Sequence, residues 1–91
     1  MRLSEEKITR GNAVAVKETV IAAARAGDVE LDLSNVRSVD STSVSILLSW
    51  VREHQSAGRR PEVRGVPEKM HSLMKLYGVE KLLSVYCHEV C

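Results

Sequence analysis

The sequence predicts a small α/β domain in which about three main helices cover a mixed, partly parallel β-sheet. Three amphipathic helical patterns alternate with two short stretches of strand character, the arrangement of βαβ units with right-handed crossovers. The chain has 91 residues, enough for one hydrophobic core and too few for two. We therefore expect residues 1–91 to form a single domain. The end of the chain (residues 79–90, and above all the tail 84–91) fits a turn, a short strand or a fraying terminus equally well.

The first helix is expected at about residues 12–26, after turn and cap residues at positions 9–12 and before Gly27 as its C-cap glycine. Its apolar residues recur at helical spacing: Ala13, Val16, Val20 and Ala24. The next segment alternates apolar with acidic side chains, which is the period of a half-buried strand. Its apolar members are Val29, Leu31 and Leu33, and its acidic members are Glu30 and Asp32.

The second helix is the clearest element, because four apolar residues follow the i, i+3, i+4, i+7 pattern: Val44, Leu47, Leu48 and Val51. Asp40 or Ser41 would cap its start, and Gly58 would end it. Residues 61–66 have the character of a short strand, with proline at its first position. A third helix would open at Pro67 and end at Gly78. Its apolar stripe is Met70, Leu73, Met74 and Tyr77.

Charge and hydropathy exclude several classes of function. The formal net charge is +1 with acids and bases interspersed, and the basic residues near position 60 lack an aromatic stacking platform. Nucleic acid is therefore not an expected partner. The N-terminus has no apolar signal region, and the apolar run 44–51 is too short to span a bilayer. We expect a cytoplasmic chain without direct membrane insertion, and its two cysteines at positions 87 and 91 suit a reducing compartment.

Catalytic and metal sites have little support in the sequence. No nucleophile, base and acid occur at a recognisable spacing, and no glycine-rich loop could cradle a phosphate. The tail Cys87-His88-x-x-Cys91 falls short of a closed tetrahedral zinc set unless His71 or another chain completes it. Free thiols are the simpler interpretation. We expect no enzyme activity, no cofactor and no resident metal.

The polar cluster Asp40-Ser41-Thr42-Ser43, where a strand passes into the second helix, is the main candidate site. One interpretation is helix capping, since these residue types are preferred at helix starts. The other is a docking contact or phospho-switch, because phosphate there would place nearly two negative charges beside Asp40. Trp50 likewise fits either packing at the edge of the core or a binding hot spot.

The segment from Leu31-Asp32-Leu33-Ser34 to Val39-Asp40-Ser41-Thr42-Ser43-Val44 resembles the signature of STAS domains, which are small non-catalytic modules. Their motif runs roughly Leu-Asp-Leu-Ser, Val, Asp-Ser-Ser-Gly-Leu, and here Ser43 and Val44 replace its Gly and Leu. In anti-anti-sigma factors the second hydroxyl of the motif is phosphorylated, and it matches Thr42. In the STAS subunit of the Mla lipid transporter the functional hydroxyl matches Ser41.

A second resemblance favours the transporter branch. Residues 69–83 contain Leu76-Tyr77-Gly78-Val79, similar to the Leu-Tyr-Gly/Asn-Leu/Val ending of Mla-type STAS proteins. It implies a partner-contact role for Tyr77, whose simpler interpretation is a core residue. Lys17 stands where Mla relatives carry Trp, and Glu6 where a strand glycine is usual.

These resemblances imply a non-catalytic subunit that binds, stabilises and regulates the ATPase of an Mla-type phospholipid ABC transporter at the inner membrane. Such a transporter maintains outer-membrane lipid asymmetry. The alternative is an anti-sigma factor antagonist switched by phosphorylation of Ser41 or Thr42. A small nucleotide-binding or enzymatic α/β domain is a third reading with little support. The expected contact surface is the junction of Asp40, Ser41, Thr42 and Ser43, the exposed face of the helix that follows it, and the third helix near Tyr77. Trp50 is a further interface candidate because Trp is enriched at binding hot spots.

The N-terminus suggests one further expectation. STAS domains usually begin with one more strand before the segment around Ile8, and the sequence leaves no evident room for it. An open sheet edge is a template for pairing with another chain. We therefore expect a homodimer formed by strand exchange at that edge.

Overall fold

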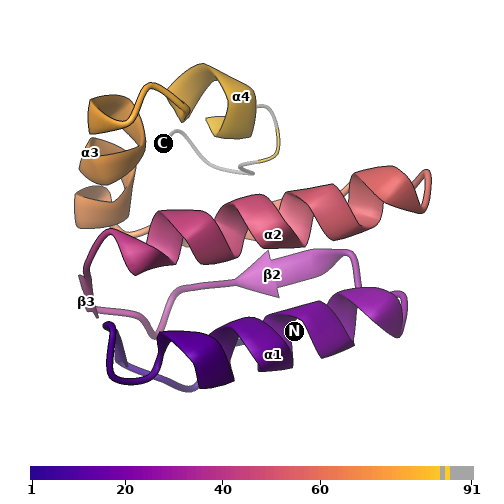
Figure 1. Ribbon diagram of the computed structural model, residues 1–91, viewed down its shortest axis with the longest axis horizontal. Coiled ribbons are helices and arrows are strands. Elements are labelled where there is room, and N and C mark those ends of the chain that lie inside the picture. The colour runs from indigo at the N-terminus through magenta and orange to yellow at the C-terminus, as the bar shows by residue number, and fades with distance from the viewer. Residues whose placement is uncertain (85, 87–91) are drawn as a thin grey trace.

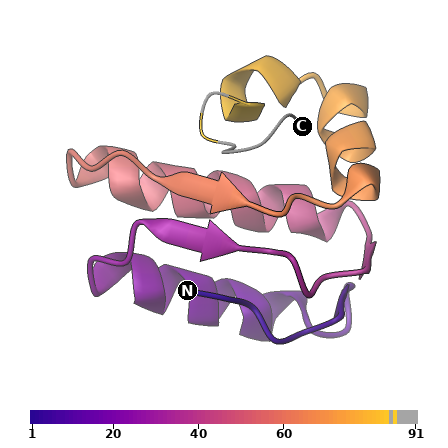
Figure 2. The same ribbon diagram turned by 180° about the vertical axis from the view of Figure 1, so that it is seen from behind.

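The computed structural model describes residues 1–84 and Tyr86. Helices α1 and α2 run parallel to each other and cover one side of the strands, while α3 and α4 pack at one end (Figures 1 and 2). This two-layer α/β arrangement confirms the predicted fold class. In chain order the elements are β1 (Lys7–Ile8), α1 (Ala13–Arg25), β2 (Glu30–Asp32), β3 (Ser38–Val39), α2 (Thr42–Ser56), β4 (Glu62–Arg64), α3 (Glu68–Leu76) and α4 (Glu80–Ser84).

The strands form two parallel pairs, β2 with β4 and β1 with β3. In the first pair Leu31 is in register with Val63, and both side chains are buried. Their strand neighbours Glu30 and Arg64 point to the opposite, polar side, where their charged groups lie 3.4 Å apart. The helices therefore cover one side of this pair, and ion pairs occupy the other.

The N-terminal residues pair with β2 on one side. The Leu3 amide donates to the Asp32 carbonyl at 3.1 Å, and the Asp32 amide donates to the Met1 carbonyl at 2.8 Å. Arg2 forms a parallel bridge with Asp32, and Leu3 is buried (Figure 2). Residues 1–3 and β1 thus both pair with the segment 30–39, and among the described residues no strand pairs with their other side. The homodimer at this edge stays a prediction.

The Leu-Asp-Leu-Ser part of the motif shapes the turn after β2. The Ser34 amide donates to Asp32 Oδ1 at 2.8 Å, and the Leu33 amide donates to the Arg64 carbonyl. Hydrogen bonds from Ser34, supported by Arg2, lower the pKa of Asp32 to about 2. Gly65 passes so close that a Cβ there would lie 2.8 Å from the Ser34 nitrogen, and its φ of +67° also favours glycine.

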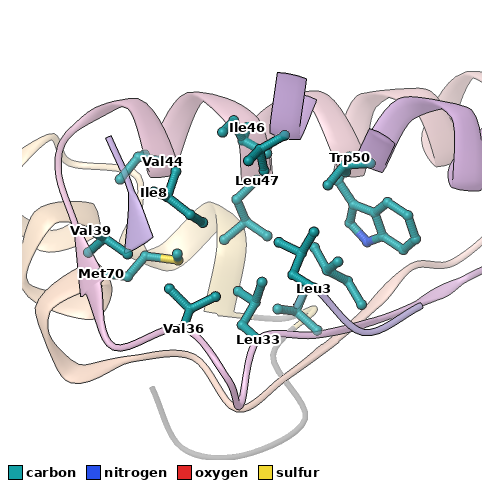
Figure 3. Packing of buried hydrophobic residues seen from close by; sticks show 14 of the residues in the cluster. Leu3, Ile8, Leu33, Val36, Val39, Val44, Ile46, Leu47, Trp50 and Met70 are labelled. Carbon is teal, nitrogen blue, oxygen red and sulfur yellow. The ribbon is translucent and has the colours of Figure 1, made fainter. Parts of the chain in front are cut away.

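Helix α2 is the central element of the core (Figure 3). Three members of its predicted stripe are buried: Val44, Leu47 and Val51. Leu48 is half-buried, and the helix also buries Ile46, Trp50 and His54. This wider burial arises because α2 packs against α1 on one side, α3 on another and the strands beneath. The four apolar residues of the predicted stripe indicate only one buried face, so they could not reveal these additional neighbours.

The C-terminal ends of α1 and α2 are joined by Arg59. Its Nε donates to His54 Nδ1 at 3.1 Å, and its terminal nitrogen donates to the Ala24 carbonyl at 2.7 Å. The His54 ring is buried and meets Trp50 edge to face, with ring centroids 4.4 Å apart. Burial, followed by the charge of Arg59, lowers the pKa of His54 below its usual 6.5, against smaller opposing effects of Asp28 and Glu53. A neutral His54 therefore accepts this hydrogen bond.

The end of the chain differs from expectation in two ways. Met70 and Met74 are buried as predicted, but Tyr77 is 53% exposed and is not a core residue. It follows the last turn of α3, beyond the part of the helix that faces the core. Residues 80–84 form a short helix instead of a turn, strand or frayed tail, and this helix buries Leu83. His71 Nε2 and Glu80 Oε2, 2.6 Å apart, connect α3 to α4.

We predict that Leu47→Ala lowers the free energy of unfolding by roughly 2–5 kcal/mol, because it leaves a cavity at the centre of the core. Leu76→Ala is the matched control: Leu76 is 73% exposed, so its truncation should change stability by no more than about 0.5 kcal/mol. Urea unfolding of both variants measures the difference. Equal losses would show that the two positions do not differ in burial.

We predict that the fold loses stability as the pH falls from about 7.5 to about 5, in part through His54. The folded-state pKa of His54 lies below 6.5, so between the two values the unfolded chain binds a proton that the folded chain does not. Acid therefore favours unfolding. Urea titrations at both pH values should show a smaller loss for His54→Phe than for the wild type. An equally steep loss in the variant would contradict the prediction.

Candidate functional site

A groove of about 510 Å³ lies over the side of α2 that faces away from the strands. Lys17 of α1 belongs to its lining, and the connection between α3 and α4 contributes Tyr77 and Val79. One face of α2 thus packs in the core, and the other face lines this groove. The lining residues are Lys17, Ser41, Val44, Ser45, Leu48, Ser49, Arg52, Tyr77 and Val79.

The entrance to α2 is capped by Asp40. Its Oδ1 accepts hydrogen bonds from the Thr42 hydroxyl and from the Thr42 amide, the latter at 2.9 Å. Its Oδ2 accepts from the Arg10 amide at 3.1 Å. These bonds, those from Thr42 first, hold the pKa of Asp40 below its usual value. Ser41 occupies the N-cap position but its side chain forms no cap hydrogen bond. Of the two residues that the sequence offered as the cap of α2, Asp40 is therefore the one whose side chain caps the helix.

The four polar residues of the junction have different surroundings. Ser41 is exposed and lines the groove, whereas Thr42 is half-buried and bonded to Asp40. Ser43 is almost fully buried, and its hydroxyl donates to the Asp40 carbonyl at 2.8 Å. The expected contact surface therefore loses Ser43, because this residue points into the interior from the buried side of α2.

Trp50 is also absent from the surface. Its side chain is completely buried, next to the His54 ring. Positions 43, 47, 50 and 54 follow the helical repeat and share the buried side of α2. The expectation that Trp50 contacts a partner is therefore corrected: in this fold the indole is a core group.

Tyr77 and Ser41 meet at the groove although 35 residues separate them in the chain. Gly78, with φ of +72°, turns the chain after α3 and brings Val79 to the same lining. These are the two positions that the resemblance to Mla-type proteins singled out. Their shared groove is a property of the tertiary structure, since no local pattern relates the two segments.

The exposed face of the second helix was expected to belong to the contact surface, but its residues were not singled out from the sequence. Ser45, Ser49 and Arg52 recur with spacings of four and three on this side of α2. That spacing is a usable signal, since serines that interrupt an apolar helix mark its outward face. Lys17 lies on α1 and had no comparable signal.

Hydroxyls, cations and apolar carbons line the groove, and no carboxylate of residues 1–84 or Tyr86 does. In the described part of the chain no three His, Cys, Asp or Glu side chains are grouped so that they could hold a metal ion. Cys87, His88 and Cys91 lie outside the described residues. His71, which the sequence offers as a further ligand for such a site, instead lies against the Glu80 carboxylate. The arrangement suits docking of another molecule.

The family model described as "Mlab, STAS domain" matches residues 1–84. The chain is a STAS domain. A search of curated proteins returned no match. STAS domains are generally non-catalytic, and membership supports a regulatory or binding role. Within the described residues of this STAS domain, no helix is both long and apolar enough to cross a bilayer.

We predict that Asp40→Ala lowers the urea midpoint of this STAS domain more than Ser41→Ala does. Asp40 accepts three hydrogen bonds at the start of α2, whereas the Ser41 side chain makes no cap bond. The Ser41 change should stay within about 0.5 kcal/mol, as for surface substitutions generally. The opposite order of the two midpoints would show that Ser41 is the functional cap.

Proposed function

We propose that this STAS domain is the non-catalytic subunit that binds and stabilises the ATPase of an Mla-type phospholipid ABC transporter. The assembly would act at the cytoplasmic face of the inner membrane and maintain outer-membrane lipid asymmetry. The observation that carries the proposal is the groove shared by Ser41 and Tyr77. The description of the matching family model, which names Mlab, supports the same branch.

The geometry suits a docking subunit. The groove lies on two long helices whose opposite faces are buried together in the core, so its shape is preformed and a partner need not order it. A standard protein–protein interface covers about 800 Å² on each partner. The folded domain exposes 5352 Å² in total, so such an interface would occupy only a modest part of its surface. Nucleotide would be bound and hydrolysed by the partner alone.

The junction favours docking over a phospho-switch. In the anti-anti-sigma factors that the chain resembles, the phosphorylated hydroxyl matches Thr42. Here that hydroxyl is half-buried and donates to Asp40, so phosphorylation would have to break the cap of α2. Ser41, which matches the functional hydroxyl of the transporter branch, is exposed and faces the groove. The hydroxyl that is open to a partner is thus the transporter-type one.

We predict that the chain co-purifies in a stoichiometric complex with the Mla-type ATPase of its own organism and hydrolyses no ATP alone. Ser41→Trp and Ser41→Glu should each weaken the complex about tenfold or more, a loss of about 1.4 kcal/mol, by filling or charging the groove. Ser41→Ala should have little effect. Binding is measured by interferometry on the immobilised ATPase.

The matched control is Ser72→Trp, which adds the same side chain at an exposed position of α3 outside the groove. It should bind as the wild type does. ATP hydrolysis by the isolated chain, or failure of the wild type to bind the ATPase, would overturn the proposed function. If Ser41→Trp and Ser72→Trp bind equally well, the groove is not the docking site.

A further inference from the structure

Two cationic side chains in the groove have no acidic counterpart. Lys17 extends from α1 and Arg52 from α2, and both are exposed. Among the residues that the structure describes, neither side chain forms an ion pair, and no carboxylate lines the groove. The groove therefore has two positive charges that no acidic side chain of the described residues pairs with.

Two acidic side chains next to the groove already have partners. Glu53, adjacent to Arg52 in the chain, lies 2.9 Å from the Arg25 guanidinium. Asp40, adjacent to Ser41, accepts hydrogen bonds from Thr42 and Arg10. Glu18, next to Lys17 in the chain, does not line the groove. A carboxylate of another molecule would therefore pair with Lys17 or Arg52 without disturbing these contacts.

Lys17 and Arg52 come from two neighbouring helices. The Arg25–Glu53 ion pair, at 2.9 Å, connects the C-terminal parts of α1 and α2. The half-buried Leu48 supplies apolar lining to the same groove, whereas Val44 is almost fully buried.

We propose, on the basis of the function proposed above, that the ATPase fills this groove with an acidic amphipathic helix. That helix has two carboxylates on one face, one for Lys17 and one for Arg52, and an apolar side chain that packs on Leu48. A helix laid in a groove presents residues one and two turns apart on one face, so one helix can bring both carboxylates to cations on two neighbouring helices. The opposite charges direct the encounter and set the register of docking.

An anionic lipid surface fits the same cations less well. Recognition of acidic membranes relies on clusters of about four to eight basic side chains on a protruding surface. The groove has two, in a hollow between helices, and the domain has a net charge of only +1. A protein segment with matched carboxylates is therefore the occupant that the geometry supports.

The test measures binding of Lys17→Glu and Arg52→Glu to the purified ATPase at about 50 mM and about 500 mM salt. Each variant should bind about tenfold or more weakly at low salt, mainly through slower association, and the wild type should weaken as salt rises. Lys69→Glu, a charge reversal at an exposed position of α3 outside the groove, is the matched control and should stay close to the wild type. Urea midpoints confirm folding, and Lys17→Met with Arg52→Met repeats the test without new charge.

Three outcomes would overturn the inference. If Lys17→Glu and Arg52→Glu weaken binding no more than Lys69→Glu while the wild type binds well, the acidic helix is wrong and the proposed function stands. If the wild type does not bind the ATPase, the proposed function fails and the inference falls with it. If the wild type binds phosphatidylglycerol vesicles, Lys17→Glu does not, and both bind the ATPase equally, the cations serve a membrane.

Discussion

The packing of α2 against α1 and the strands is the contact on which the rest of the structure depends. Its buried side contributes Leu47, Trp50 and His54 to the core, and these residues determine the orientation of the helix about its own axis. Once that orientation is set, Ser41, Ser45 and Ser49 must face outward. The position of the groove therefore follows from the burial of the opposite side of the same helix.

The two ends of the helix pair are held by different means. At the start, Asp40 joins the cap of α2 to the segment before α1 through Thr42 and Arg10. At the far end, Arg59 connects His54 to the Ala24 carbonyl, while Arg25 meets Glu53 outside. With both ends connected, the helices keep one register. That register determines how far apart Lys17 and Arg52 lie, so the docking surface depends on contacts outside it.

The polar junction thus has a structural and a recognition part. Asp40, Thr42 and Ser43 form hydrogen bonds within the fold, and only Ser41 presents its side chain to the groove. Capping and docking, which the sequence alone left as alternatives, are divided between neighbouring residues. Tyr77 joins the recognition part from the end of α3, where the chain has left the core.

Local patterns in the sequence determined the elements of this fold and their order. Helices α1, α2 and α3 lie close to their predicted ranges, because apolar periodicity, capping residues and terminal glycines act within a few residues of one another. The motif around residues 31–44 predicted the STAS family, and the match over residues 1–84 confirms it. Ser41 and Tyr77 were also recognised from their motifs.

Only the tertiary structure decided which faces are covered and which distant segments meet. Trp50 is buried and Tyr77 exposed, and the sequence had left both placements open for each of them, because burial depends on neighbours from other elements. The pairing of residues 1–3 with β2 joins segments about 30 positions apart and has no local signature. Lys17 was not predicted for the same reason. It lines a groove between elements, and the position of such a groove depends on long-range contacts that short-range patterns do not encode.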